Sequence, residues 1–209
     1  IFMNIDGTVK STKEINDFTT NGPELDNKDD FGFSIANIGD LDGDGVNDLA
    51  VGAYNDDMDE SGTANGYTSA VKRGYKHIIF MNIDGTVEST TEINDFTTNG
   101  PELDNGDVFG HSVANIGDLD GDGVNDLAVG ASLDDMDEDG NATAATDRGA
   151  VHIIFMKTGG DLVKSTKEIN DSTTSLGLAA QDMFGISVAN IGDLDGDGVN
   201  DLAVGASYD

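Results

Sequence analysis

One stretch of sequence occurs three times in the chain, and it limits what the chain can fold into. It runs from Phe31 to Ala53 (FGFSIANIGDLDGDGVNDLAVGA), and its copies start at Phe109 and Phe184, 78 and then 75 residues further along. The three copies differ only at their third and fifth positions. Because self-similarity at a regular period marks a repeat architecture, the sequence predicts an array of similar units.

The stretches between the copies also repeat, and they predict β-hairpins. Ile1–Ile5 and Thr8–Ile15 predict two strands around Asp6-Gly7, a dipeptide that favours a type I′ turn. The pattern returns over His77–Ile93 and, with a Gly-Gly turn, over His152–Ile169. Polar linkers follow each hairpin and predict loops, at 16–30, 94–108 and 170–183.

The repeated stretch itself predicts two further strands. Phe31–Ile38 alternates, with Phe31, Phe33 and Ile35 expected on one face. Asp48–Ala53 places Leu and Val on one face and small residues, Ala and Gly, on the other. A face of small residues would let another sheet approach closely.

Each unit is therefore expected to form four short antiparallel strands, and the fold class is all-β. Four-stranded sheets repeated around an axis are the blades of a β-propeller. The expected order is strands 3 and 4 of a split blade (1–30), two complete repeats (31–108 and 109–183), and strands 1 and 2 of a split blade (184–209). Ile1 corresponds to Ile79 and Asp209 to Asp56, so we expect a segment of a longer array, or protomers that complete each other's blades, rather than a closed three-bladed ring.

The charge of the chain restricts its partners. There are 41 acidic residues against 10 basic ones, a formal net charge of −31. Nucleic acids and anionic membranes are poor partners for such a surface, because phosphate binding needs clustered Lys and Arg. Acidic groups this dense repel one another unless cations neutralise them. A salt-adapted, highly soluble surface and bound divalent metal both remain open. There is no cysteine, and no apolar run is long enough to suggest a membrane helix.

Each copy of the repeated stretch contains the pattern D-x-D-x-D-G-x-x-D, a candidate metal loop. Alternate acids converge on one point if the chain curls around it, and the glycine at the sixth position permits the sharp turn. The residue at the seventh position can add a backbone carbonyl. The candidate ligands are Asp40, Asp42, Asp44, Val46 and Asp48; Asp118, Asp120, Asp122, Val124 and Asp126; and Asp193, Asp195, Asp197, Val199 and Asp201.

A ligand set made only of oxygen atoms on a flexible loop suits Ca²⁺ better than Mg²⁺, which demands a tight octahedron and keeps its waters. The sequence therefore predicts three Ca²⁺ sites, one per copy. An EF-hand also uses alternate acids, but it needs a bidentate acid at loop position twelve and flanking helices. Position twelve here is Val51 or its counterparts, within an expected strand, which excludes the EF-hand.

The Phe-Gly start, the aspartate loop and the L-A-V-G-A ending resemble FG-GAP repeats, the calcium-binding blades of integrin α-subunit propellers and of many bacterial surface proteins. The resemblance implies that the loop joins strands 1 and 2 of a blade, with acids at positions one, three, five and nine and the carbonyl at seven as ligands. It also implies an extracellular or cell-surface location. The repeats here are longer than is usual for the family and nearly identical to each other.

Other polar groups are weaker candidates. The acidic stretches Asp56–Glu60 and Asp134–Asn141 could hold a second cation, although a solvated loop is favoured. His77 and His152 occupy equivalent strand positions and are expected to be structural, while His111 stands where the other copies carry Phe or Ile and marks a position tolerant of change. Asn141 and Asn170 each begin a glycosylation acceptor pattern.

The expected function is an extracellular, calcium-stabilised array of propeller blades with a structural or adhesive role, and not an enzyme, since no Ser-His-Asp or phosphate-binding arrangement is present. Three versions remain open. The array could bind a protein or glycan partner through loops at one rim. It could self-associate through its split blades into a fibre. It could also be a non-catalytic appendage of a secreted enzyme.

Overall fold

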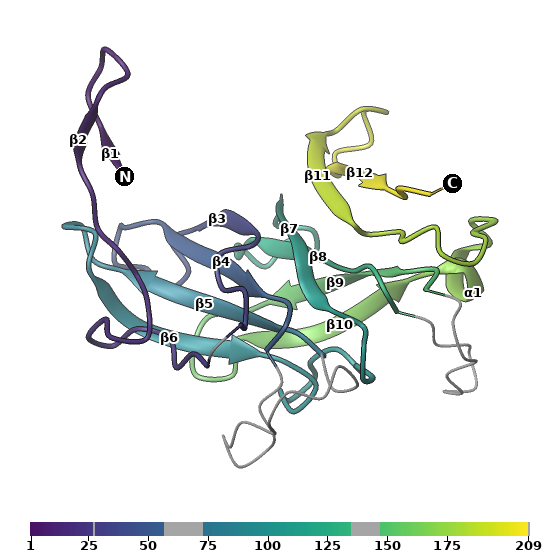
Figure 1. The fold of residues 1–209 in the computed structure, drawn as a ribbon. Helices are drawn as coiled ribbons and strands as arrows, with labels where there is room; N and C mark the ends of the chain where they lie inside the picture. Colours follow the sequence, from purple (N-terminus) through teal and green to yellow (C-terminus); the bar gives the residue numbers. More distant parts are fainter. Residues whose placement is uncertain (27, 57–72, 135–146, 209) are drawn as a thin grey trace.

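The computed structural model describes residues 1–26, 28–56, 73–134 and 147–208, and their regular secondary structure is almost entirely β-strand, joined by turns and loops (Figure 1). The strands pair into four antiparallel sheets, two with four strands and two with two. In chain order the sheets contain β1 (Phe2–Met3) and β2 (Val9–Ser11); β3 (Ile35–Gly39), β4 (Asp48–Ala53), β5 (Tyr75–Met81) and β6 (Val87–Ile93); β7 (Phe109–Gly117), β8 (Asp126–Ala131), β9 (Ala150–Met156) and β10 (Val163–Ile169); and β11 (Ser187–Gly192) and β12 (Asp201–Gly205).

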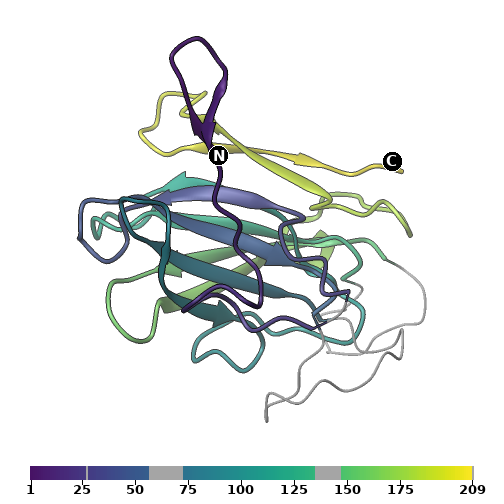
Figure 2. The ribbon, with the colours of Figure 1, turned by 60° about the vertical axis from the view of Figure 1, so that its left-hand side comes forward.

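This order of two, four, four and two strands is the one predicted, and each complete sheet is a meander whose neighbours in sequence are neighbours in space. The linker before β11 carries one turn of helix, α1 (Asp171–Thr174), capped by the side chain of Asn170. No helix in the described segments has the length and apolar character needed to cross a membrane. Figures 1 and 2 place both two-stranded sheets on the same side of the complete sheets.

The second strand of each repeat packs as predicted, with its small residues against the next sheet. A Cβ atom on Gly52 of β4 would lie 2.1 Å from the carbonyl oxygen of Gly110, at the start of the following sheet. A Cβ on Gly130 of β8 would lie 1.9 Å from the carbonyl oxygen of Gly185. Only glycine leaves room for this approach of backbone to backbone.

The first strand of each repeat differs from the prediction. Alternation from Phe31 is wrong, because the glycine after the phenylalanine has a positive φ, 89° at Gly32 and 90° at Gly110. In β7 the pairing shifts register between Phe109 and Ser112, and β3 begins only at Ile35. The phenylalanine is thereby separated from the residues after it: in the second copy Phe109 is fully buried, whereas His111 and Val113 are only partly buried.

The hairpin turn is also of another type than predicted. A type I′ turn needs positive φ at both central residues, but Gly7 has φ 83° while Asp6 does not lie in the positive region. The Asp6 side chain instead accepts hydrogen bonds from the N–H and the hydroxyl of Thr8, at 3.0 and 2.6 Å. Asp84 and Thr86 repeat this arrangement. The aspartate thus stabilises a turn in which only the glycine is left-handed.

The apolar core lies between successive sheets rather than within one. The largest cluster combines Ile38, Ile78 and Phe80 of the first complete sheet with Phe109 and Leu127 of the second. A second cluster joins the second complete sheet to the β11–β12 pair. The two complete sheets and the β11–β12 pair therefore bury faces against one another, as a repeat array requires. The β1–β2 pair is exposed at each of its residues.

Side chains of the repeated stretch also tie each sheet to the one before it. Asn115 donates to the carbonyl of Asn37 and Asn190 to that of Asn115, both at 3.0 Å. On the other side of the junction, the hydroxyl of Ser34 donates to the carbonyl of Gly110 at 2.7 Å. The Ser112 hydroxyl makes the same 2.7 Å bond to Gly185. The near identity of the copies is explained in part by these contacts, which occur both between the two complete sheets and between the second of them and the β11–β12 pair.

Candidate metal centre

The three aspartate loops connect the first two strands of their sheets, β3 to β4, β7 to β8 and β11 to β12. Each loop is curled by its own first aspartate. The two carboxylate oxygens of Asp40 accept the backbone N–H groups of Gly43 and Gly45 at 2.7 and 2.9 Å. Asp118 and Asp193 make the equivalent pairs of bonds. The chain thus turns around the first acid in all three copies.

Two glycines make this curl possible. Gly43 and Gly45 have φ values of 86° and 89°, a region that residues with a Cβ seldom occupy. The fifth-position acid closes the turn, since Asp44 accepts the N–H of Val46 at 2.7 Å. The corresponding bonds in the other loops measure 3.0 and 2.8 Å. That the backbone carbonyl of the seventh loop residue is a metal ligand stays a prediction.

The curl brings most of the predicted acids together. In each of four groups, three carboxylates offer oxygen atoms that lie within 4.8 Å of one another. These groups are Asp40, Asp42 and Asp48; Asp42, Asp44 and Glu88; Asp118, Asp120 and Asp122; and Asp193, Asp195 and Asp197. Among the residues that the structure describes, Asp126 and Asp201 do not join a group of this kind. The donors are exclusively carboxylate oxygens, the type that Ca²⁺ prefers.

The ninth-position aspartate has a clear structural task. Asp48 accepts the N–H of Leu41 at 2.9 Å and the N–H of Met81, at the end of β5, at 3.0 Å. Asp126 accepts from Leu119 and Met156 at 2.8 Å each. Burial raises the pKa of Asp48, which the two backbone bonds lower and the charges of Asp42 and Asp44 raise further. The ninth acid therefore fastens the loop to the third strand of its own sheet.

The asparagine before it fastens the loop to the preceding sheet. The amide of Asn125 donates to the carbonyl of Ile38 at 3.0 Å, and the amide of Asn200 donates to that of Ile116 at 2.9 Å. A loop that is fixed on both sides keeps its shape and its acids close together. Any cation bound there would be linked to the packing of two neighbouring sheets.

Two residues beside the loops are absent from the sequence-based prediction. Glu88, the second residue of β6, forms a group with Asp42 and Asp44. Lys164, the second residue of β10, contacts Asp120 and Asp122 through its Nζ, at 2.7 and 2.9 Å. These hydrogen bonds lower the pKa of Asp122 and raise that of Lys164. The opposite charges at one repeat position were a visible signal, but the sequence did not show that this position faces the loop.

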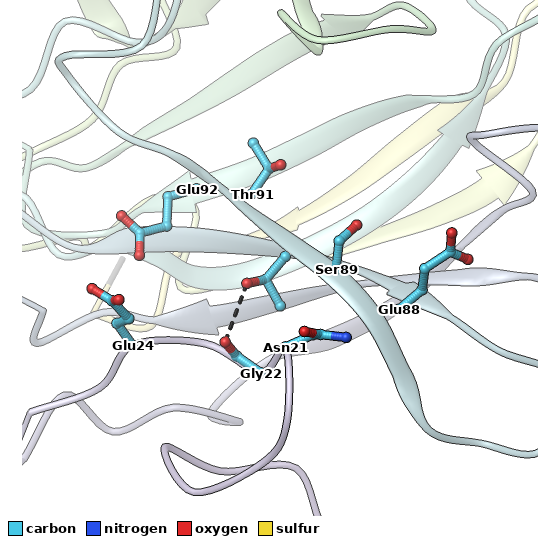
Figure 3. A pocket seen from close by; sticks show the side chains of 8 residues that line it. Asn21, Gly22, Glu24, Glu88, Ser89, Thr91 and Glu92 are labelled. Atoms are coloured by element: carbon cyan, nitrogen blue, oxygen red, sulfur yellow. Dashed lines mark hydrogen bonds between the residues drawn. The ribbon is translucent and has the colours of Figure 1, made fainter.

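A polar groove extends from the same region along the outer strand of the first complete sheet. It has a volume of about 420 Å³ and lies between the N-terminal linker and β6. Figure 3 shows Glu88 at one end and Glu24 and Glu92 at the other. The hydroxyl of Thr90 donates to the carbonyl of Gly22 across it, at 3.4 Å. The groove is where the linker crosses the edge strand.

The two strand histidines are buried beside acids. His77 Nε2 lies 3.6 Å from Asp56 Oδ2 and its Nδ1 lies 3.8 Å from Glu92 Oε1. His152 Nε2 lies 3.6 Å from Asp134 Oδ2. Both rings are almost fully buried, and each meets the edge of the phenylalanine that opens its repeat. This placement supports the structural role predicted for them.

The remaining weaker candidates fall in different places. Beyond Asp56 and Asp134, the acidic stretches proposed to hold a second cation lie outside the described residues, as does Asn141. The side chain of Asn170 caps α1 and donates to Glu168. His111 stacks on Phe33 at a centroid distance of 4.8 Å and meets the edge of Tyr54 at 5.3 Å, so this position joins two sheets.

The family model of the FG-GAP repeat matches residues 31–71 and 109–154, which include the first two aspartate loops. The chain belongs to the FG-GAP repeat family. Its relatives include integrin alpha-4 and integrin alpha-5 of Xenopus laevis, 31% and 35% identical over 84% of this chain, and human integrin alpha-6, 30% identical over 86%. The two complete sheets are accordingly propeller blades. The chain spans only 13–14% of the length of these three relatives.

Proposed function

We propose that this chain is a calcium-stabilised array of FG-GAP propeller blades, with blades beginning at Phe31, Phe109 and Phe184, that acts outside the cell in adhesion or as a structural material. The observation that carries the proposal is the convergence of three aspartates in every loop, with the same curl in all three. They are the first, third and ninth in the first loop and the first, third and fifth in the other two. The family relationship to integrin α-subunits supports an extracellular, adhesive and non-enzymatic role.

The aspartate loops fit a hard divalent cation by the chemistry of their donors. Each gathers several carboxylates in a small exposed volume, where their charges repel one another. In the second loop the ammonium of Lys164 lies between two of these carboxylates, so the arrangement already accepts a positive charge. The first, third and fifth aspartates would hold Ca²⁺, with the ninth acid and the seventh carbonyl as predicted further ligands.

Calcium would act by linkage to folding. A cation that binds the folded loop and not the unfolded chain stabilises the fold by mass action, by about 2.7 kcal/mol per site at a concentration of one hundred times Kd. It would also remove repulsion between the acids. Since each loop is bonded to the preceding sheet through its asparagine, the stabilisation would extend across blade junctions. Millimolar extracellular calcium suffices for sites of modest affinity.

Thermal melting tests the proposal directly. We expect the melting temperature to fall by at least about 5 °C when Ca²⁺ is removed by a chelator. A control variant with Asp42→Asn, Asp120→Asn and Asp195→Asn should melt at nearly the same temperature with and without Ca²⁺. Equal melting of the unmodified chain in both buffers, with no binding heat in calorimetry, would overturn the proposal.

Exposed apolar residues on the two-stranded sheets, called half-sheets here (β1–β2 and β11–β12), support a role in assembly. Ile1 and Phe2 are 79% and 37% exposed, whereas their counterparts Ile79 and Phe80 in the complete blade are 0% and 8% exposed. We therefore propose that a further blade covers these half-sheets, either from a longer chain or from a second copy that extends the array into a filament. Light scattering and negative-stain microscopy at increasing protein concentration test the second arrangement, which a strictly monomeric chain would exclude.

A ligand-binding version rests on a different observation. Phe33, Tyr54 and His111 form an aromatic group at the junction of the two complete blades, with ring centroids 4.5–5.3 Å apart. Aromatic faces are favourable platforms for apolar or sugar surfaces, so this junction is the place where a protein or glycan partner would bind. A glycan array tests this version: the unmodified chain should bind a glycan that the Phe33→Ala variant does not bind. The same test applies if the chain is a non-catalytic appendage of a secreted enzyme.

A further inference from the structure

The two complete blades carry opposite charges at one position beside their aspartate loops. Glu88 in β6 and Lys164 in β10 are both the second residue of the fourth strand, and each follows a valine that is at most 4% exposed. A carboxylate oxygen of Glu88 lies within 4.8 Å of carboxylate oxygens of Asp42 and Asp44. Lys164 donates to Asp120 and Asp122, the equivalent acids of the second loop, at 2.7 and 2.9 Å.

The fold explains why this position faces the loop. The turn between the third and fourth strands lies at the same end of the sheet as the aspartate loop. The ninth acid holds the two together, since Asp48 accepts the N–H of Met81 at 3.0 Å and Asp126 accepts that of Met156 at 2.8 Å. The first residues of the fourth strand are therefore presented to the third and fifth acids of the loop.

We propose that this position sets the cation affinity of each loop, so that the loops of the two complete blades are unequal. In the first blade Glu88 acts as an additional acidic ligand or near neighbour of the cation and strengthens binding. In the second blade Lys164 is a tethered counter-ion that a metal must displace, which weakens binding. The inference rests on the proposed function, because it concerns the same cation sites.

The physical basis is the charge that a divalent cation meets. In the first loop the cation would meet the loop acids and the additional carboxylate of Glu88. In the second loop it would meet the loop acids and the ammonium of Lys164, which already bonds two of these acids. Ligand charge is a main determinant of calcium affinity in acidic loops. Replacing a nearby negative charge by a positive one opposes binding of a doubly charged ion even in a high dielectric, and about a tenfold loss of affinity is expected.

The same difference affects the blades without metal. Lys164 offsets the repulsion between Asp120 and Asp122, whereas Glu88 adds to that between Asp42 and Asp44. The first blade therefore depends more on calcium for its stability, and the second keeps its loop closed by an internal ion pair. Calcium would act on the two complete blades in two steps rather than one.

A calcium titration of the whole chain followed by amide NMR tests the inference. Gly45 and Gly123 are equivalent residues of the two loops, and both amides donate to the first acid. We expect the Gly45 signal to reach its endpoint at a calcium concentration about tenfold lower than the Gly123 signal. The double variant Glu88→Lys with Lys164→Glu keeps the net charge of the chain and should reverse this order.

Lys10→Glu is the matched control. Lys10 occupies the equivalent position of β2, in a half-sheet without an aspartate loop of its own, so the order of saturation should not change. Saturation of both loops together in the unmodified chain, or an unchanged order in the double variant, would overturn the inference while leaving calcium binding intact. No response of either glycine to Ca²⁺, with no binding in calorimetry, would overturn the proposed function and this inference with it.

Discussion

The two complete blades share their repeated stretch almost residue for residue, but their third strands differ at a fully buried position. Lys76 of β5 and Val151 of β9 are equivalent, and both are 0% exposed. Lys76 donates to the hydroxyl of Ser34 at 3.0 Å, whereas Val151 packs in an apolar cluster with Ala128 and Ile153. The comparison teaches that the repeated stretch provides the junction geometry, while residues outside it determine how stable each junction is.

Exchanging these two residues should produce the largest effects. Val151→Lys places an ammonium in an apolar cluster and should destabilise the chain by about 3–5 kcal/mol, a cost typical of an uncompensated buried charge. Lys76→Val removes a buried amine and should be neutral or stabilising, because the cost of taking this polar group out of water disappears. Urea denaturation at saturating Ca²⁺ measures both. If Lys76→Val raised the free energy of unfolding by as much as Val151→Lys lowered it, the two blades would not differ in how they tolerate a lysine at this position.

The pH dependence of stability provides an independent measure. Burial lowers the pKa of Lys76 well below its ordinary value of 10.5. As the pH falls below 10.5, the unfolded chain binds a proton that the folded chain does not, so the free energy of unfolding decreases by up to about 1.4 kcal/mol per pH unit until the folded pKa is reached. Lys76→Met should lose this slope. Identical pH profiles of the two proteins would show that Lys76 is charged when folded.

Glycine replacement at the junctions should have the next largest effect. Gly52→Ala and Gly130→Ala each place a Cβ within 2.1 Å of a carbonyl of the next sheet. The sheets must separate to accept it, and each variant should lose about 2–3 kcal/mol. Gly160→Ala is the control, since nothing lies within 4 Å of the added atom and the residue is not left-handed. A junction glycine that tolerated alanine as well as Gly160 would show that the sheets slide easily.

The smallest effect is expected at the two junction serines. Ser34→Ala and Ser112→Ala each remove a hydroxyl bonded at 2.7 Å to the glycine carbonyl of the next sheet. The first should cost about 2 kcal/mol and the second about 1 kcal/mol, because only Ser34 also accepts from the buried Lys76. A double-mutant cycle with Lys76→Met should abolish the difference. If Ser34→Ala cost the same in the unmodified chain and in the Lys76→Met variant, the hydrogen bond between Lys76 and Ser34 would not contribute to stability.

Much of the fold follows from local sequence signals. The predicted order of strands is confirmed. It could be predicted because alternating residues and turn-forming dipeptides depend only on residues that are close together in the sequence. The small residues of β4 correctly predicted a close approach of the next sheet. The first strand could not be predicted in the same way, because an alternating pattern of residues does not show that the glycine after the phenylalanine adopts a positive φ. In β7 the register shift lies at this glycine, between Phe109 and Ser112.

The candidate site likewise has some features that the local sequence determines and others that depend on tertiary packing. Within the second loop the sequence by itself determined the curl and the convergence of Asp118, Asp120 and Asp122, because the hydrogen bonds that curl the loop around Asp118 span at most five residues. Only the tertiary structure decided what the loops face. Lys164 reaches Asp120 across 44 positions of sequence, and Asn125 reaches Ile38 across 87. Contacts at that separation depend on how strands and sheets pack, which a local pattern of residues does not specify.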